Sequence, residues 1–412
     1  MTAPGLRLPA AAPRDTPPYE LRTPAWRTAF AVVLASAMGV SVYSIPALAV
    51  LSGLLIDDLG IDRSQFGLVV TAVAVSNAAC AQVAGRLVDR VGGRRVLLGV
   101  FALTVVSAAL LAVAPSFWAL LALAALAGAP NGASNPATNK VIAEYVPAGR
   151  RGGVVGTKQS GVQAGMFLTG VVLPPVALAT SWRWSLLLVS AVSVLGLLAA
   201  WRLVPAGDRA AVRRAGRAAE RPGRLPSAVR WLAAYSSLMG FGGAAVTSFL
   251  PLYAHEDLGW SLPAAGAATA AIGLVGMAAR IVLGPRMERM GHVALPLAVI
   301  AVGSAASVAG LLLAARTPWL VWPAVVVAGL TVATWNAFTM LAAISAGSEQ
   351  VGRSTGVLVL GFMGGYASSP VLFGTSVEVT GSYLTGWVVC GAVFLAAAGL
   401  MLLWRRVVAA RP

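Results

Sequence analysis

The chain of 412 residues alternates long apolar runs with short loops that carry most of its charge. A helix needs about 20 mainly apolar residues to cross a membrane, because each residue adds 1.5 Å and the hydrocarbon core is about 30 Å thick. Only 11% of the residues are charged, so lipid must be the solvent for much of the chain. Twelve segments meet the length requirement: 26–55, 66–86, 95–114, 117–146, 153–179, 183–204, 228–254, 262–284, 293–315, 319–346, 354–378 and 383–404. The sequence therefore predicts an all-α membrane protein with twelve transmembrane helices.

The basic residues are distributed unevenly between the two sides of these spans. With the N-terminus inside, Arg63, Arg183 and Arg316 are the only basic loop residues on the outside. Cytoplasmic loops of membrane proteins are enriched in Lys and Arg, so both termini are predicted to be cytoplasmic. The frequent Arg, Ala and Gly are typical of a GC-rich genome, and we expect a multi-pass protein of a bacterial inner (plasma) membrane. The net charge of +16 is spread over short loops and forms no patch for nucleic acid.

The spans divide into two groups of six. Residues 25–204 and 228–404 are predicted to form two helical bundles, joined by the polar, Arg-rich cytoplasmic linker 205–227. Residues 1–24 are rich in Pro, Ala and Arg and have no apolar core, so we interpret them as a disordered cytoplasmic tail and not as a signal peptide. Residues 405–412 form a second cytoplasmic tail.

The two halves are related by an internal repeat. A shift of 199 residues aligns 57–60 (DDLG) with 256–259 (EDLG), and a shift of 201 pairs Asn135 with Asn336. The first shift also aligns glycines and charged residues at both ends of the second and eighth spans: Gly67 with Gly266, Gly85 with Gly284, Asp89 with Glu288, Arg90 with Arg289, and Gly92 with Gly291. Parallel copies of this kind indicate two pseudo-symmetric six-helix bundles, an architecture found among secondary transporters.

The loop between the second and third spans carries a specific motif. Residues 85–95 read GRLVDRVGGRR, which resembles the signature G-x-L-x-D-R-x-G-R-R-x of the major facilitator superfamily, with Gly93 where that family usually has Arg. The resemblance covers the twelve spans in order. It implies a gating role for Asp89 and Arg90, because a charged cluster at the membrane face can latch the two halves together on the cytoplasmic side. The alternative is that these charges only set the topology. The residues predicted to form this gate are Gly85, Asp89, Arg90, Gly92, Arg94, Glu144, Glu288 and Arg289.

Polar side chains also lie within the spans. Asn135 and Asn139, four residues apart, share one face of the fourth span and either bond a neighbouring helix or line a cavity. Lys140 and Lys158 are the only lysines among 30 basic residues, and they either extend to the cytoplasmic interface or, for Lys158 above all, attract an anionic substrate. Gln163 follows Lys158 on the fifth span.

The second half contributes further candidates. Arg280 either stabilises the gate or binds a substrate carboxylate, which a guanidinium matches with two hydrogen bonds. Aromatic residues away from the ends of their spans either pack in the core or line a central cavity. The residues predicted to bind substrate are Lys158, Arg280, Asn135, Asn139, Gln163, Trp335, Asn336, Tyr366 and Tyr43.

These features predict a secondary active transporter that works by alternating access and not an enzyme. Its substrate is expected to be a small organic or inorganic anion, because the charges embedded in the spans are mainly basic. The alternative is an efflux pump for a neutral or hydrophobic compound. Two cysteines and two histidines show no metal-ligand spacing, so we expect neither a metal nor another cofactor. Protons are a candidate coupling ion, and we expect a monomer in the lipid bilayer.

Overall fold

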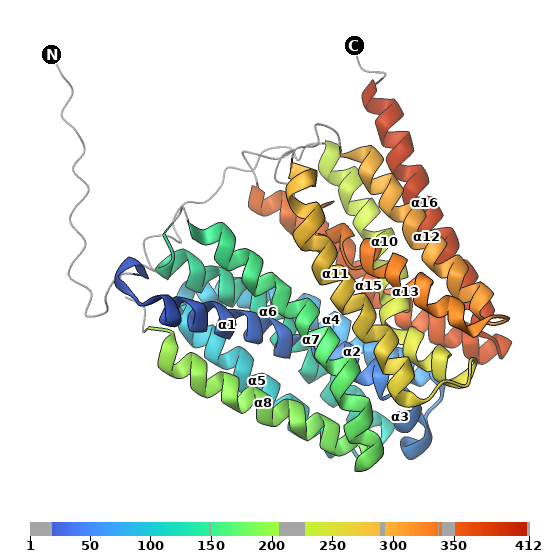
Figure 1. Cartoon of the computed structure of the whole chain (residues 1–412), viewed down its shortest axis with the longest axis horizontal. Coiled ribbons are helices and arrows are strands. Elements are labelled where there is room, and N and C mark those ends of the chain that lie inside the picture. Colours follow the sequence, from blue (N-terminus) through green and yellow to red (C-terminus); the bar gives the residue numbers. More distant parts are fainter. Residues whose placement is uncertain are drawn as a thin grey trace.

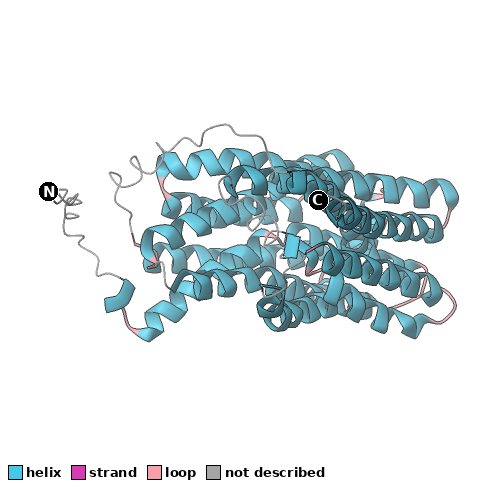
Figure 2. Ribbon diagram, turned by 90° about the horizontal axis from the view of Figure 1, so that it is seen from above, coloured by secondary structure: helices cyan, strands magenta, loops and turns pink. Residues whose placement is uncertain are grey.

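The computed structural model describes residues 19–147, 150–205, 227–288, 293–336, 338–339 and 351–409. These residues form helices and connecting loops, with no strand in the described ranges (Figure 2). Ten of the described helices are long and apolar enough to cross a membrane: α4 (Arg63–Val91), α5 (Gly93–Ala112), α6 (Phe117–Tyr145), α7 (Arg151–Ala179), α8 (Trp182–Leu203), α10 (Ser227–Glu256), α11 (Leu262–Glu288), α12 (Ala294–Ala314), α15 (Val351–Thr380) and α16 (Tyr383–Ala409).

The first span is broken into successive helices. It consists of α1 (Pro24–Ser41) and α2 (Ser44–Val50), which is bent by 51° from α1, and the short helix α3 (Ser52–Leu59) follows it. Pro46 lies near the start of α2, where its ring and missing N–H disrupt the hydrogen bonding of the preceding turn. The break between α1 and α2 follows from this proline.

The tenth span begins with η3 (Pro318–Leu320) and α13 (Val321–Thr331), and turns interrupt it at residues 332–334. Residues 340–346 of the predicted span lie outside the described residues. Each of the twelve predicted segments therefore contains helix, and the predicted all-α membrane fold is confirmed.

The described termini differ from the predicted tails. Residues Tyr19–Leu21 form the short 3-10 helix η1, and Tyr19 packs against Trp26 and Phe30 of α1. The last helix, α16, continues to Ala409. The linker 206–226 lies outside the described residues.

The repeat seen in the sequence is also present in the backbone. Gly60 ends α3 with a φ of 59°, and its equivalent Gly259 follows α10 with a φ of 66°. The left-handed conformation suits glycine at both positions because it has no Cβ. Gly67 and Gly266, another equivalent pair, each lie against a backbone carbonyl of the other half, that of Pro370 and of Gly170 respectively. The two halves thus meet through equivalent glycine contacts, α4 with α15 and α11 with α7.

The two halves approach each other at one end and diverge toward the other. We call the end where α1 begins and α16 ends the terminal face, and the other end the opposite face. In Figure 1, the ribbons of the two halves separate toward the terminal face. Near the opposite face, Phe66 of α4 packs edge-on against Phe249 of α10, with ring centroids 5.6 Å apart, and Thr71 donates to the carbonyl of Ala367 on α15 over 2.9 Å. The bundle is therefore closed at the opposite face.

Candidate substrate-binding site

Lys158 is buried in the first half and points at α6. It lies seven residues after the start of α7, or about 10 Å along the helix axis. Its Nζ donates to Asn135 Oδ1 (3.0 Å), Thr138 Oγ1 (3.0 Å) and Asn139 Oδ1 (2.7 Å), which uses all three N–H groups. Only 1% of the residue is exposed. The structure thus brings three of the predicted residues together, and Lys158 does not extend to the membrane interface.

The fold of α6 explains this arrangement. Asn135, Thr138 and Asn139 have the i, i+3, i+4 spacing that places side chains on one face of a helix. Gly128 and Gly132, about two turns and one turn before Asn135 on the same side of α6, lie against the backbone of α4, so the orientation of α6 is fixed by close packing. Asn135 and Asn139 remain exposed, with Lys158 beneath them.

The charge of Lys158 has no carboxylate partner among the described residues. The described ion pairs involve Arg63, Lys140 and Arg183 as the cations. Removing a charge from water is costly unless it is paired, and amide and hydroxyl oxygens solvate the ammonium without neutralising it. A positive potential therefore extends to the accessible amides of α6.

Two glutamines of α7 lie close to the crossing with α11. Gln163 is 5% exposed and packs against Gly273 and Gly276 of α11. The Oε1 atoms of Gln163 and of Gln159, one turn away, are buried and have no hydrogen-bond partner in the described part of the chain. A buried carbonyl oxygen without a donor is unfavourable, so both oxygens are available to a donor group of a ligand. Gln159 was not among the predicted site residues, although its i, i+4 spacing from Gln163 places the two on one face.

Arg280 of α11 binds the backbone of the tenth span, and its role in the gate or in binding a substrate carboxylate stays a prediction. Its Nε and Nη2 donate to the carbonyl oxygen of Ala333, over 3.1 Å and 2.6 Å. Ala333 lies in the turn that interrupts the tenth span, where helix hydrogen bonds are lost. The guanidinium therefore satisfies a carbonyl at this break, and its side chain is half-buried.

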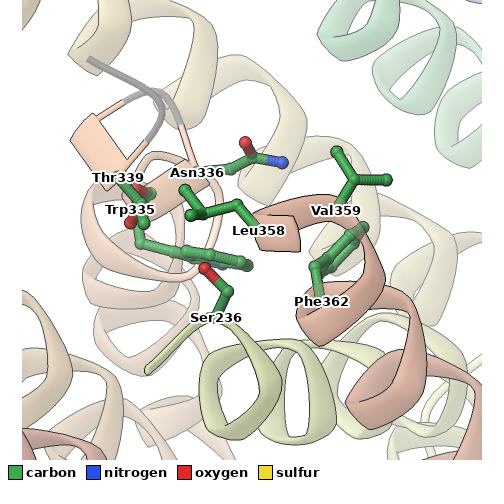
Figure 3. Close-up of a pocket in the computed structure, with 7 residues that line it drawn as sticks. All are labelled: Ser236, Trp335, Asn336, Thr339, Leu358, Val359 and Phe362. Atoms are coloured by element: carbon green, nitrogen blue, oxygen red, sulfur yellow. Dashed lines mark hydrogen bonds between the residues drawn. The ribbon is translucent and has the colours of Figure 1, made fainter. Parts of the chain in front are cut away.

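A small pocket in the second half contains two of the predicted residues, Trp335 and Asn336 (Figure 3). The Trp335 ring contacts the Phe362 ring, with centroids 5.5 Å apart and planes at 59°. Tyr366, also predicted, packs on the other side of Phe362 at 5.2 Å and contacts Thr247 through its hydroxyl. Five lining residues were not predicted: Ser236, Thr339, Leu358, Val359 and Phe362. The spacing of Leu358, Phe362 and Tyr366 at i, i+4, i+8 is a sequence signal that could have found two of them.

Tyr43 does not join these groups. It is 2% exposed in the core of the first half, and its hydroxyl lies 3.1 Å from Ser107 Oγ. Its predicted contact with substrate stays a prediction.

The signature loop connects helices of the first half. Asp89 pairs with Lys140 of α6 over 3.0 Å, and Arg94 donates to the carbonyls of Val204 and Trp201 over 2.6 and 2.8 Å. Gly92 joins α4 to α5 with a φ of 91°. Of the other predicted gate residues, Gly85 and the exposed Arg90 lie on α4, and Glu144 lies near the end of α6. The side chain of Glu288 and all of Arg289 lie outside the described residues.

A second charged group, which we call the Arg63 cluster, consists of Arg63, Glu256, Glu378 and Tyr383 at the opposite face. Arg63 Nε lies 2.8 Å from Glu256 Oε2, and Arg63 Nη1 lies 3.7 Å from Glu378 Oε2. Tyr383 donates to the same Glu256 oxygen over 2.6 Å. Arg63 belongs to the first half and its three partners to the second, so the cluster joins the two halves where they are closed.

Two related helical bundles that cross a membrane, with polar side chains between them, define a polytopic membrane transporter. A family model described as Major Facilitator Superfamily matches residues 29–370. The chain belongs to this family.

Curated relatives and solved structures are consistent with this assignment. The chain is 27% identical over 375 residues to the probable sulfoacetate transporter SauU of Cupriavidus necator, covering 84% of this chain and 86% of that protein. It is 32% identical over 160 residues to the gallate transporter of Pseudomonas putida, covering 38% and 34% of the two chains. A bacterial homologue of the human lysosomal transporter Spinster, solved in an inward-facing, unoccupied conformation, shares the fold with a TM-score of 0.74, 15% identity and coverage of 93% and 98%.

Proposed function

We propose that this protein is a secondary transporter that moves a small organic anion by alternating access. The observation that carries the proposal is the buried ammonium of Lys158, which is held by neutral oxygens beneath two exposed asparagines. An anion that reaches Asn135 and Asn139 enters the field of this charge and gains hydrogen bonds from their amide groups.

The distribution of charge along the helices supports an anion over a cation. Lys158 of α7 and Arg280 of α11 each lie about two turns inside their helices. No acidic residue in the described spans lies as far from a helix end. A cationic substrate would find no counter-charge at this depth, whereas an anion finds two.

The names of several relatives point to the same class of substrate. The Cupriavidus necator protein is named for sulfoacetate and the Pseudomonas putida protein for gallate, and both compounds are anions at neutral pH. We carry over to this chain only the shared property of a small organic acid.

The proposal includes the orientation in the membrane. The excess of Arg in the loops at the terminal face favours a cytoplasmic position for that face in a bacterial inner membrane. With this orientation, the bundle is closed to the outside and diverges toward the cytoplasm. The coupling ion that we propose to test first is the proton.

Transport by the purified full-length protein in proteoliposomes tests the proposal. Uptake of radiolabelled organic acids would be measured with and without a pH gradient, for wild type, Lys158→Gln and Lys158→Arg. Arg316→Gln is a matched control, because it removes an exposed cation at the opposite face. We expect Lys158→Gln to reduce anion uptake at least tenfold and Arg316→Gln to leave it unchanged.

The second candidate is efflux of a neutral or hydrophobic compound, which the aromatic lining of the pocket around Trp335 and Phe362 favours. A neutral panel is therefore run beside the acids. Transport of neutral compounds that is equal in wild type and Lys158→Gln, with no anion transport, would contradict the anion proposal and support this one.

A further inference from the structure

Helices α7 and α11 cross where the two halves meet, and they separate toward the terminal face. Near the opposite face, Gly170 of α7 and Gly266 of α11 each lie against the backbone carbonyl of the other. Two turns further along α11, Gly273 still lies against the backbone carbonyl of Gln163, but the nearest α7 atom to Gly276 belongs to the Gln163 side chain. The backbones of the two helices therefore diverge toward the terminal face.

The register of this crossing places Gln159 level with Arg280. The two helices run in opposite directions, so each turn backward along α7 matches a turn forward along α11. Gln163 is level with Gly273 and Gly276, and the next turn toward the terminal face brings Gln159 on α7 and Arg280 on α11. Gln159 shares a face of α7 with Gln163, and Arg280 shares a face of α11 with Gly276, because both pairs are four residues apart. Gln159 and Arg280 therefore occupy the next level of the crossing.

Both side chains have unused hydrogen-bonding groups in this conformation. Gln159 Oε1 is buried and has no donor among the described residues. Of the five N–H groups of Arg280, one on Nε and one on Nη2 donate to the Ala333 carbonyl, and the others have no protein acceptor in the described part of the chain. A buried acceptor without a donor is unfavourable. A donor and an acceptor that both lack partners thus lie at the same level on different halves.

The existing contact of Arg280 does not join the halves. Arg280 lies on α11 and Ala333 in the tenth span, and both belong to the second half. The contact nevertheless anchors the guanidinium at the boundary with the first half. A Cβ added to Gly276 would lie 2.6 Å from Ala333 Cβ and 3.6 Å from Gln163 Oε1, so Ala333 is close to the glutamine face of α7. One edge of the guanidinium is held there, and the other edge is free to bond across the boundary.

We propose that Gln159 and Arg280 form a latch that holds the terminal face closed in the other state of the transport cycle. Closing this face brings the diverging ends of α7 and α11 together, and Gln159 Oε1 then accepts from an N–H of Arg280 that the Ala333 carbonyl leaves free. The donor is charged, so the bond is stronger than one between neutral groups. This inference rests on the proposed alternating access and goes beyond it by naming a contact that stabilises the second state.

A glutamine suits a latch that must also open. Its carbonyl oxygen solvates the guanidinium without neutralising it, so Arg280 keeps the charge that attracts an anion. A glutamate at the same position would form an ion pair with Arg280 and hold the terminal face closed more strongly. The substitution Gln159→Glu therefore distinguishes a latch from a side chain that only fills space.

Distances between spin labels measure the ratio of molecules open and closed at the terminal face, in purified full-length protein reconstituted into a bilayer. Labels at Ala143 and Arg230, both exposed, report on the ends of α6 and α10 at this face, after replacement of Cys80 and Cys390. Gln159→Glu should lower the ratio of open to closed molecules at least tenfold, and Gln159→Leu should raise it about tenfold.

Two controls separate the latch from general effects of substitution. In an Arg280→Gln background, Gln159→Glu should no longer lower the ratio, because its partner cation is missing. Gln82→Leu removes an exposed glutamine of α4 and should leave the ratio unchanged. Thermal unfolding verifies that each variant is folded.

The outcomes distinguish this inference from the proposed function. A ratio that Gln159→Glu leaves unchanged, or lowers equally in the Arg280→Gln background, would overturn the latch and leave anion transport, measured by uptake, standing. The expected shift in a protein that transports no anion would support the latch and overturn the proposed substrate class. A single distance that stays the same in every folded variant would overturn both the latch and alternating access.

Discussion

Replacing Arg63 with Gln should shift the bundle toward a state that is open at the opposite face. In the structure, Arg63 Nε donates to Glu256 over 2.8 Å and Nη1 lies 3.7 Å from Glu378, and both acids belong to the other half. The substitution removes these cross-half contacts and leaves two carboxylates near each other without their cation.

The size of this effect follows from the exposure of the pair. The side chains of Arg63 and Glu256 are 37% and 21% exposed, so solvent screens the attraction and its contribution is about 1 kcal/mol. Because this free energy is present only while the opposite face is closed, its loss changes the ratio of closed to open molecules about fivefold.

Distances between spin labels would measure this ratio in the reconstituted protein. Labels at Thr180 and Ser261, both exposed, report on the ends of α7 and α11 at the opposite face, after replacement of the native Cys80 and Cys390. Arg63→Gln should increase the ratio of the long-distance to the short-distance population about fivefold over wild type.

Arg183→Gln is a close control for this experiment. Arg183 is 38% exposed and lies 2.7 Å from Asp58, but both residues belong to the first half. Its loss should leave the distance distribution unchanged. If Arg63→Gln and Arg183→Gln gave the same distribution, the Arg63 cluster would not be a latch between the halves.

Three further predictions concern packing and stability. Gly67→Val should reduce transport at least tenfold, because the added side chain meets the carbonyl of Pro370, whereas Gly99→Val, which meets nothing within 4 Å, should not. Hydrogen bonds from Arg183 and Trp182 hold the pKa of Asp58 below its usual range, so this pair should stabilise the fold above about pH 4 and lose its effect as the pH falls through the lowered pKa. Thermal unfolding of Asp58→Asn should therefore differ from that of wild type at pH 7 and converge with it in acid. Thr138→Val removes one acceptor of Lys158 and should destabilise the protein by about 1–3 kcal/mol, and a bound anion should reduce the difference by accepting from the freed N–H.

The sequence predicts the spans well because length and apolarity are local properties. Each run of about 20 apolar residues must cross the membrane as a helix, since lipid satisfies no backbone group. The repeat could also be found by aligning the two halves of the sequence, and the positive φ values of the equivalent residues Gly60 and Gly259 agree with it.

The candidate site could be predicted only where its residues share a helix face. Asn135 and Asn139 were found by their spacing, but the direction of Lys158 depends on how α7 packs against α6, which no local pattern specifies. The lining of the pocket was predicted only in part. No local pattern marks Ser236 and Thr339 as lining residues, because they come together only when three distant segments fold side by side.

The Arg63 cluster was missed for the same reason. Arg63 was noted only as a basic residue on the outside, and its partners Glu256 and Glu378 are 193 and 315 residues away in the sequence. Contacts between the halves depend on the conformational state of the bundle, and a single sequence contains no direct record of that state.

The most direct test of anion transport compares two substrates of nearly equal shape that differ in charge, benzoate and benzamide. Initial uptake rates into proteoliposomes would be measured for wild type and Lys158→Gln. We expect wild type to prefer benzoate at least tenfold and Lys158→Gln to lose this preference while it still folds. An equal preference in both proteins would show that the buried ammonium does not select the substrate, and would contradict the proposed role of Lys158.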